Sequence, residues 1–258
     1  MVFPLQVDIL YGPVNSRRLG RSLGINLMPG AYKVCSFNCA YCHYGWTRVH
    51  TLDVQEYRQD LPSLEKVVER LEIAARSALD FDFLTFSGNG EPTLYPQFAE
   101  LVDEVVRIRE RYRPEARIAL LSNSTGLGRA EVRQAIPKID RPVFKLDSAV
   151  EATFRQLNRP APGVELAQIL GWLSSLRDIY LQTLLVDGTP GNAREEDLLD
   201  YFEAVARIRP REVHLYSIDR AVPDPHLVRI PGERLERIAR RGEVLTGVKM
   251  KAFYMRET

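Results

Sequence analysis

The residues best suited to chemistry are three cysteines that lie within eight positions of one another. They form the segment Cys35-Ser-Phe-Asn-Cys39-Ala-Tyr-Cys42, a CxxxCxxC spacing, and the 258-residue sequence has no other cysteine. Three thiolates at such short spacings can bind three irons of a cubane cluster and leave the fourth iron open to a chelating ligand. No cysteine is left for a disulfide framework, so the segment predicts metal binding or catalysis.

Other uses of the same segment stay open. A structural zinc site needs four N or S ligands, and the fourth would be His43, which directly follows Cys42 and would have to bend back onto the same ion. The run Cys39-Ala-Tyr-Cys42-His43 also matches the CxxCH pattern of c-type haem attachment, but that predicts export and leaves Cys35 unexplained. Free cysteines in a core are disfavoured by the glycine and asparagine residues around the segment.

The elements that must position the cysteines alternate between short apolar runs and longer amphipathic segments, a pattern typical of βα units. The predicted strands are Ser22–Leu27, Phe81–Phe86, Arg117–Leu121, Val143–Leu146, Ile179–Val186 and Glu212–Ser217. The predicted helices are Ser63–Ala78, Tyr95–Tyr112, Arg129–Ala135, Glu195–Ile208 and Gly232–Leu245, with a helical stretch Glu151–Leu176 broken by Pro160 and Pro162, and an extended tail Lys249–Tyr254.

Six βα units in a row predict one α/β domain over residues 1–258, either most of a barrel or an open doubly wound sheet. Both architectures place ligands at the carboxyl ends of the strands. Gly88–Glu91, Asn123, Asp147 and Ser217–Asp219 each follow a predicted strand, so one rim would collect them. Each is also a common turn former, so any one of them alone is weak evidence for a site.

Composition and charge bear on the class of protein, its partners and its location in the cell. The formal net charge is +1, with 45% hydrophobic and 27% charged residues, which is ordinary for a globular domain and leaves nucleic acid as a partner undecided. The sequence contains no apolar run of membrane-spanning length, and MVFPLQVDIL lacks the basic start and long apolar stretch of a signal peptide. We therefore expect a cytoplasmic protein that is not bound to a membrane.

The cysteine segment, with an aromatic residue before its last cysteine, resembles the signature of the radical S-adenosylmethionine (SAM) superfamily. Three further segments are similar to it. Gly88-Asn-Gly-Glu91-Pro resembles the glycine-rich loop that receives the SAM amino group, with one extra residue. Leu120-Leu-Ser-Asn123-Ser resembles a strand end that reads TNG in related enzymes, with Ser124 in place of glycine. Lys145-Leu-Asp147 lies where such proteins contact the SAM carboxylate and ribose.

The resemblance implies a partial (β/α)6 barrel and an enzyme that cleaves SAM reductively to a 5′-deoxyadenosyl radical. It implies a [4Fe–4S] cluster and SAM as cofactors and an external one-electron reductant of flavodoxin or ferredoxin type. The metal ligands would be Cys35, Cys39 and Cys42, and the cofactor-binding residues would be Tyr41, Gly88, Asn89, Gly90, Glu91, Asn123, Lys145 and Asp147. No residue is assigned to the chemistry on the substrate.

Two segments are similar to the wybutosine-related group of tRNA-modifying Fe–S oxidoreductases. They are Tyr11-Gly-Pro-Val-Asn-Ser-Arg-Arg18-Leu-Gly and Thr153-Phe-Arg-Gln-Leu-Asn158-Arg-Pro160. This resemblance implies tRNA as a candidate substrate, although the sequence lacks the additional cysteines and flavodoxin-like extension of a full wybutosine enzyme. The alternative is an iron–sulfur protein without catalysis, an electron carrier or metal-delivery module.

Several arginines flank the predicted strands. Arg17, Arg18 and Arg21 precede the first strand and Arg220 follows the sixth. A guanidinium offers a planar two-pronged fork for phosphate or carboxylate, so these residues could grip a substrate. In a chain with 35 basic residues, a solvated surface is the other reading.

Overall fold

A computed structural model describes residues 2–255, which divide into two compact units. The N-terminal unit comprises Pro4–Ser36 and Thr47–Val143, and the C-terminal unit comprises 2–3, Phe37–Trp46 and 144–255. The cysteine segment contributes to both units, because Cys35 belongs to the first and the other two cysteines to the second. The single domain over 1–258 stays a prediction.

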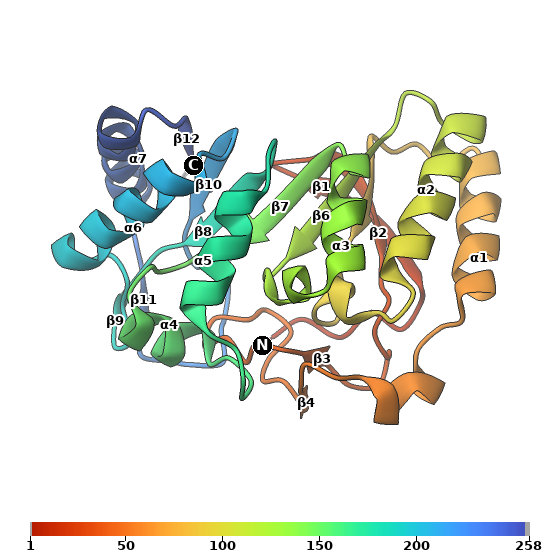
Figure 1. The fold of residues 1–258 in the computed structure, drawn as a ribbon, viewed down its shortest axis with the longest axis horizontal. Coiled ribbons are helices and arrows are strands. Elements are labelled where there is room, and N and C mark those ends of the chain that lie inside the picture. Colours follow the sequence, from red (N-terminus) through yellow and green to blue (C-terminus); the bar gives the residue numbers. More distant parts are fainter. Residues whose placement is uncertain (1, 256–258) are drawn as a thin grey trace. The chain divides into compact units, whose positions relative to one another are not determined.

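The N-terminal unit is built on a sheet whose strands lie in the order β1-β2-β5-β6. Strand β1 (Leu10–Ser16) pairs antiparallel with β2 (Gly20–Ile25), while β2, β5 (Phe83–Phe86) and β6 (Arg117–Ser122) are parallel. Helix α2 (Phe98–Tyr112) packs between α1 (Leu64–Arg76) and α3 (Ala130–Ala135) (Figure 1). The shorter elements are β3 (Val34–Cys35), β4 (Val49–His50) and the 3-10 turns η1 (Gln55–Asp60), η2 (Pro92–Leu94), η3 (Thr125–Gly128) and η4 (Ile136–Lys138).

The C-terminal unit contains a parallel sheet with β10 (Glu212–Tyr216) between β8 (Tyr180–Leu184) and β12 (Met250–Phe253). A second, antiparallel pair joins β9 (Val186–Gly188) and β11 (Leu227–Arg229). Its helices are α4 (Glu151–Asn158), α5 (Leu166–Ser175), α6 (Glu195–Ile208) and α7 (Gly232–Thr246). Strand β7 (Arg141–Lys145) begins in the N-terminal unit and ends in the C-terminal unit.

The sequence predicts the helices well because their signals are local. Helix α1 begins after Ser63, whose side chain caps the helix by accepting from the Lys66 amide at 3.3 Å, and α6 has the predicted bounds. Helices α4 and α5 are separate, as the break at Pro160 and Pro162 predicts. Among residues 2–255, none of the helices combines the length and the apolar composition of a transmembrane span.

Two strand predictions are corrected by the structure. Strand β1 was not expected, because it carries Pro13 and is half exposed, without the alternating apolar pattern of a core strand. The predicted strand Ile179–Val186 ends at Leu184. There the side chain of Asn192 bends the backbone by donating to the Leu184 carbonyl at 2.8 Å and accepting from the Val186 amide at 2.8 Å. A long-range asparagine of this kind leaves no signal in the strand itself.

Candidate functional site

The first cysteine lies beside the carboxyl end of β6. Cys35 ends strand β3 and is 8% exposed, and its sulfur accepts a hydrogen bond from Asn123 Nδ2 at 3.5 Å. The same amide donates to Ser36 Oγ at 2.9 Å, and Asn123 Oδ1 accepts from the Thr125 amide at 3.1 Å. Asn123 therefore holds the sulfur in a fixed polar environment.

The glycine-rich loop packs directly on the strand that carries Cys35. The Val34 amide donates to the Asn89 carbonyl at 3.3 Å, and the Glu91 amide donates to the Val34 carbonyl at 3.3 Å. Gly90 has φ +148°, and a Cβ there would lie 1.7 Å from the Val34 carbonyl oxygen. Gly88 has φ +117°. The sequence predicts this loop as a binding element, and the structure shows why both glycines are needed for its shape.

Substitution of Gly90 by alanine is expected to lower the free energy of unfolding by about 2–3 kcal/mol, because the added methyl group overlaps the Val34 backbone. Gly171 in α5 is a matched control, since a Cβ there meets nothing within 4 Å. Gly171→Ala should be neutral or stabilise by up to about 1 kcal/mol through helix propensity. Urea unfolding of both variants tests this, and equal midpoints for the two would contradict the packing described.

Asn89 and Glu91, two of the residues predicted to bind the cofactor, have side chains that form hydrogen bonds within the protein. The Asn89 side chain, fully buried, donates to the carbonyls of Gln6 at 2.7 Å and Pro29 at 2.9 Å and accepts from the Gln6 amide at 2.8 Å. Glu91 is 1% exposed and its carboxylate accepts four hydrogen bonds from Thr93, Ser122 and Asn123. Burial raises the pKa of Glu91, and these hydrogen bonds oppose the rise. Both side chains hold the loop together.

Ser124, the residue after Asn123, stands where the TNG pattern has glycine. Ser124 has φ +79°, in the left-handed region where glycine is favoured. The TNG pattern that this segment resembles has glycine at this place, so Ser124 adopts a conformation typical of glycine at a small conformational cost.

The second and third cysteines lie in a loop that is fastened to the end of α4. The Asn38 amide donates to the Asn158 carbonyl at 3.1 Å, and the Ala40 amide donates to the Leu157 carbonyl at 2.9 Å. Asn158 Nδ2 lies 3.7 Å from Cys39 Sγ and donates to it. The segment Thr153–Pro160, which carries part of the family resemblance, is therefore the support of the cysteine loop.

A buried polar network surrounds Asp147 in the same unit. Its carboxylate accepts from the Leu184 amide at 2.8 Å, from Asn158 Nδ2 at 2.6 Å and from the Tyr41 hydroxyl. Lys145 Nζ lies 3.5 Å from Asp147 Oδ1 and donates to the Tyr216 hydroxyl at 2.9 Å. The structure thus brings together three predicted residues, Tyr41, Lys145 and Asp147, and joins them to Asn158.

The charges in this network are set by burial and by each other. Burial alone would lower the pKa of Lys145, but the negative charge of Asp147 and further groups outweighs it, so the pKa is raised and the side chain is an ammonium ion. That ammonium lies 4.9 Å from the Tyr41 ring centre and 5.4 Å from that of Tyr216. Burial also raises the pKa of Tyr41 well above its ordinary value. Tyr41 is consequently a neutral donor.

Sequence reasoning missed three members of the site. Tyr216 ends strand β10, where only the following residues were expected to matter. Asn158 was noted within a family-like segment but given no role. Asn192 donates to the Asp147 carbonyl at 2.7 Å from a loop 45 residues away. The strand-end position of Tyr216 and the motif around Asn158 were available signals, whereas Asn192 had none.

The donor set fits an iron–sulfur cluster. All three cysteines are free, and the sulfurs of Cys35 and Cys39 each accept an asparagine amide hydrogen bond. Such bonds favour thiolates and tune clusters that thiolates ligate. Within the part of the chain that the structure describes, no group of three or more His, Cys, Asp or Glu side chains is arranged to hold a metal ion. The fit is thus one of donor chemistry.

Comparison with known families and proteins identifies relatives. The chain matches the family described as the Radical SAM superfamily over residues 31–202. It is 35% identical over 212 residues to a UPF0026 protein of Methanocaldococcus jannaschii, covering 81% of this chain and 63% of that protein. It is 32% identical over 219 residues to a UPF0026 protein of Synechocystis, covering 83% and 77%. The chain thus spans less than two thirds of the archaeal relative.

Solved structures share the fold at low identity. TYW1 with a lysine–pyruvate adduct bound matches with a TM-score of 0.57 at 16% identity, covering 88% of this chain and 75% of that chain. A radical SAM methyltransferase from Sphaerobacter thermophilus matches with a TM-score of 0.61 at 17% identity, covering 92% and 67%. With the family match, these likenesses confirm the predicted fold class, an α/β fold of the partial (β/α)6 radical SAM type.

Proposed function

Because this chain belongs to the radical SAM superfamily and has UPF0026 homologues, we propose that it is an enzyme that cleaves S-adenosylmethionine reductively. A [4Fe–4S] cluster would supply the electron for this cleavage and so generate a 5′-deoxyadenosyl radical, with an external flavodoxin or ferredoxin as reductant. The observation that carries the proposal is the pair of asparagine amides on the sulfurs of Cys35 and Cys39.

In this proposal Cys35, Cys39 and Cys42 would ligate three irons, and the fourth iron would be open to the amino and carboxylate groups of SAM. The backbone of the loop Gly88–Glu91 would receive the amino group. Its glycines would allow close approach, and hydrogen bonds of the buried Asn89 and Glu91 side chains hold its shape.

The chain's own charged residues would orient the cofactor. The Lys145 ammonium, with 14% of its side chain exposed, offers a fixed positive charge to a carboxylate. Asn123 and Asp147 are the proposed ribose partners, and the Tyr41 ring the adenine partner. Because Asp147 already accepts from three groups besides Lys145, its main contribution is to hold Lys145 and Tyr41 in place.

The test is direct. The full chain, reconstituted anaerobically with iron and sulfide and given dithionite and SAM, should release 5′-deoxyadenosine. If fully loaded protein releases none, the electron-carrier or metal-delivery alternative takes its place.

For the substrate we propose a base in tRNA, on the family-like segments and on one surface feature of the C-terminal unit. Two exposed aromatic rings there carry arginines: the Arg159 guanidinium lies 4.4 Å from the ring centre of Trp46, which is 44% exposed, and Arg220 lies 4.4 Å from that of Phe3, which is 41% exposed. Aromatic rings and guanidinium planes are the groups on which unstacked bases stack. Binding of tRNA that weakens with salt would support this substrate, and no binding at low salt would remove it.

A further inference from the structure

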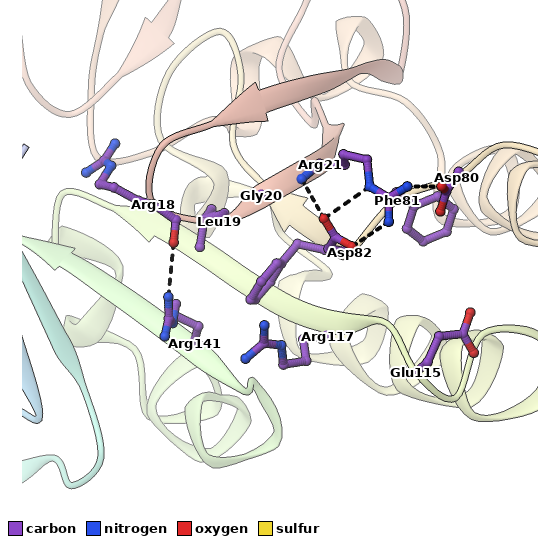
Figure 2. Close-up of a pocket in the computed structure, with 11 residues that line it drawn as sticks. Arg18, Leu19, Gly20, Arg21, Asp80, Phe81, Asp82, Glu115, Arg117 and Arg141 are labelled. Atoms are coloured by element: carbon purple, nitrogen blue, oxygen red, sulfur yellow. Dashed lines mark hydrogen bonds and ion pairs between the residues drawn. The ribbon is translucent and has the colours of Figure 1, made fainter. Parts of the chain in front are cut away.

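A pocket in the N-terminal unit lies at the amino ends of its strands, the opposite ends from those that carry the cysteine strand and the glycine loop. Arg21 is the second residue of β2, Asp82 immediately precedes β5, and Arg117 and Arg141 are the first residues of β6 and β7. Together with neighbouring residues they line a pocket of about 320 Å³ (Figure 2). No residue of the proposed SAM site lines it.

One arginine of this pocket is already neutralised. Arg21 forms ion pairs with Asp80 and Asp82, and its amide donates to Asp82 Oδ2 at 2.8 Å. Hydrogen bonds from Arg21 lower the pKa of Asp82 to about 2, with a smaller contribution from the charge of Arg117. Asp82 is therefore ionised near neutral pH, and both of its carboxylate oxygens accept hydrogen bonds from the Arg21 guanidinium.

The guanidinium groups of two further arginines lie over one buried aromatic ring. The guanidinium carbons of Arg117 and Arg141 lie 4.5 Å and 5.8 Å from the ring centre of Phe83, which is 1% exposed. Figure 2 shows Arg117 and Arg141 on the same side of the pocket, away from Asp80. The Arg117 guanidinium has no hydrogen-bond or ion-pair partner among residues 2–255. Two positive charges therefore lie over the same aromatic ring.

The Arg141 guanidinium is held in place by a backbone carbonyl. Its Nη1 donates to the Arg18 carbonyl at 3.1 Å, which fixes the guanidinium at the edge of the ring. Fixed guanidinium groups pair with phosphate or carboxylate through two parallel hydrogen bonds. Arg18 and Arg21, singled out in the sequence as possible anion ligands, thus belong to a pocket distinct from the carboxyl-end loops.

We propose that this pocket binds a small dianion, a phosphate monoester or a dicarboxylate, between Arg117 and Arg141. A long polyanion fits less well, because Asp80, Asp82 and Glu115 also line the pocket and would repel its further charges. The dianion would remove the repulsion between the two guanidinium groups. The proposal is independent of the reaction proposed above.

Calorimetric titration of the full, reconstituted chain with inorganic phosphate and with malonate, at low ionic strength and without SAM, tests the site. Saturable binding of at least one probe is expected. The Arg117→Gln/Arg141→Gln double variant should bind that probe about ten- to a hundredfold more weakly, since charge-assisted hydrogen bonds of that order are lost.

The matched control is Arg70→Gln/Arg237→Gln, which removes two charges from exposed helix positions outside the pocket. It should bind like the wild type. The tighter of the two probes identifies the ligand as phosphate or carboxylate. The proposal is overturned if neither probe saturates or if both double variants bind the probe equally.

Discussion

Replacement of Cys39 by alanine is expected to abolish release of 5′-deoxyadenosine by the reconstituted protein. In the proposed site Cys39 supplies one of three protein ligands, and its sulfur is the one that Asn158 fixes from α4. The sequence holds no fourth cysteine that could replace it. Without this ligand the cluster is lost or misassembled, so no electron reaches SAM.

The measurement is chromatographic quantification of 5′-deoxyadenosine together with iron content. Ser175→Ala, which removes one polar atom at the exposed end of α5, is the control and should keep both at wild-type level. Circular dichroism of the iron-free proteins should be the same for all three, because the change is small. Undiminished product from Cys39→Ala would show that this thiol is not a cluster ligand.

The largest effect on stability is expected for Asp147→Ala, about 3–5 kcal/mol lost from the free energy of unfolding. The substitution leaves the buried Lys145 ammonium without its counter-charge. It also removes the acceptor of the Tyr41 hydroxyl, the Asn158 amide and the Leu184 backbone. With Asp147 gone, burial becomes the main influence on Lys145 and its pKa should fall.

Urea unfolding checks this, with Asp200→Ala on the exposed side of α6 as the control, expected to change stability by less than about 0.5 kcal/mol. A double-mutant cycle with Lys145→Met separates the charge pair from the other bonds. The double variant should be more stable than the sum of the single losses predicts. If the free energy of unfolding of Asp147→Ala lies within about 1 kcal/mol of the wild-type value, the network does not stabilise the fold as described.

How far the site could be predicted depends on whether its signal is local. The cysteine spacing is a local signal. The glycine loop and the residues after β6 and β7 are predicted as site residues because each follows an apolar strand, and parallel strands end together. The contacts of those side chains cannot be predicted from the sequence. Glu91 and Asn89 resemble ligands there, but in the structure their polar atoms form hydrogen bonds within the protein. Asn192 and Tyr216 meet the site through contacts distant along the chain.

The same distinction holds for the fold. Helices α1 and α6 were predicted almost to the residue from caps and apolar spacing. Strand β1 was missed because only its pairing with β2 makes it a strand. The pocket at Arg117 and Arg141 could not be predicted from the sequence either, because it is formed by the first residues of strands that are far apart in the sequence.

In the proposed site three thiolates hold an iron–sulfur cluster with one coordination position open to SAM. Electron paramagnetic resonance of the reduced, anaerobically reconstituted chain, with and without SAM and after metal analysis of the same sample, is the sharpest test. We expect about four iron atoms per chain and a spectrum that changes when SAM is added. Zinc in place of iron, or a loaded cluster whose spectrum SAM leaves unchanged, would overturn the proposed site.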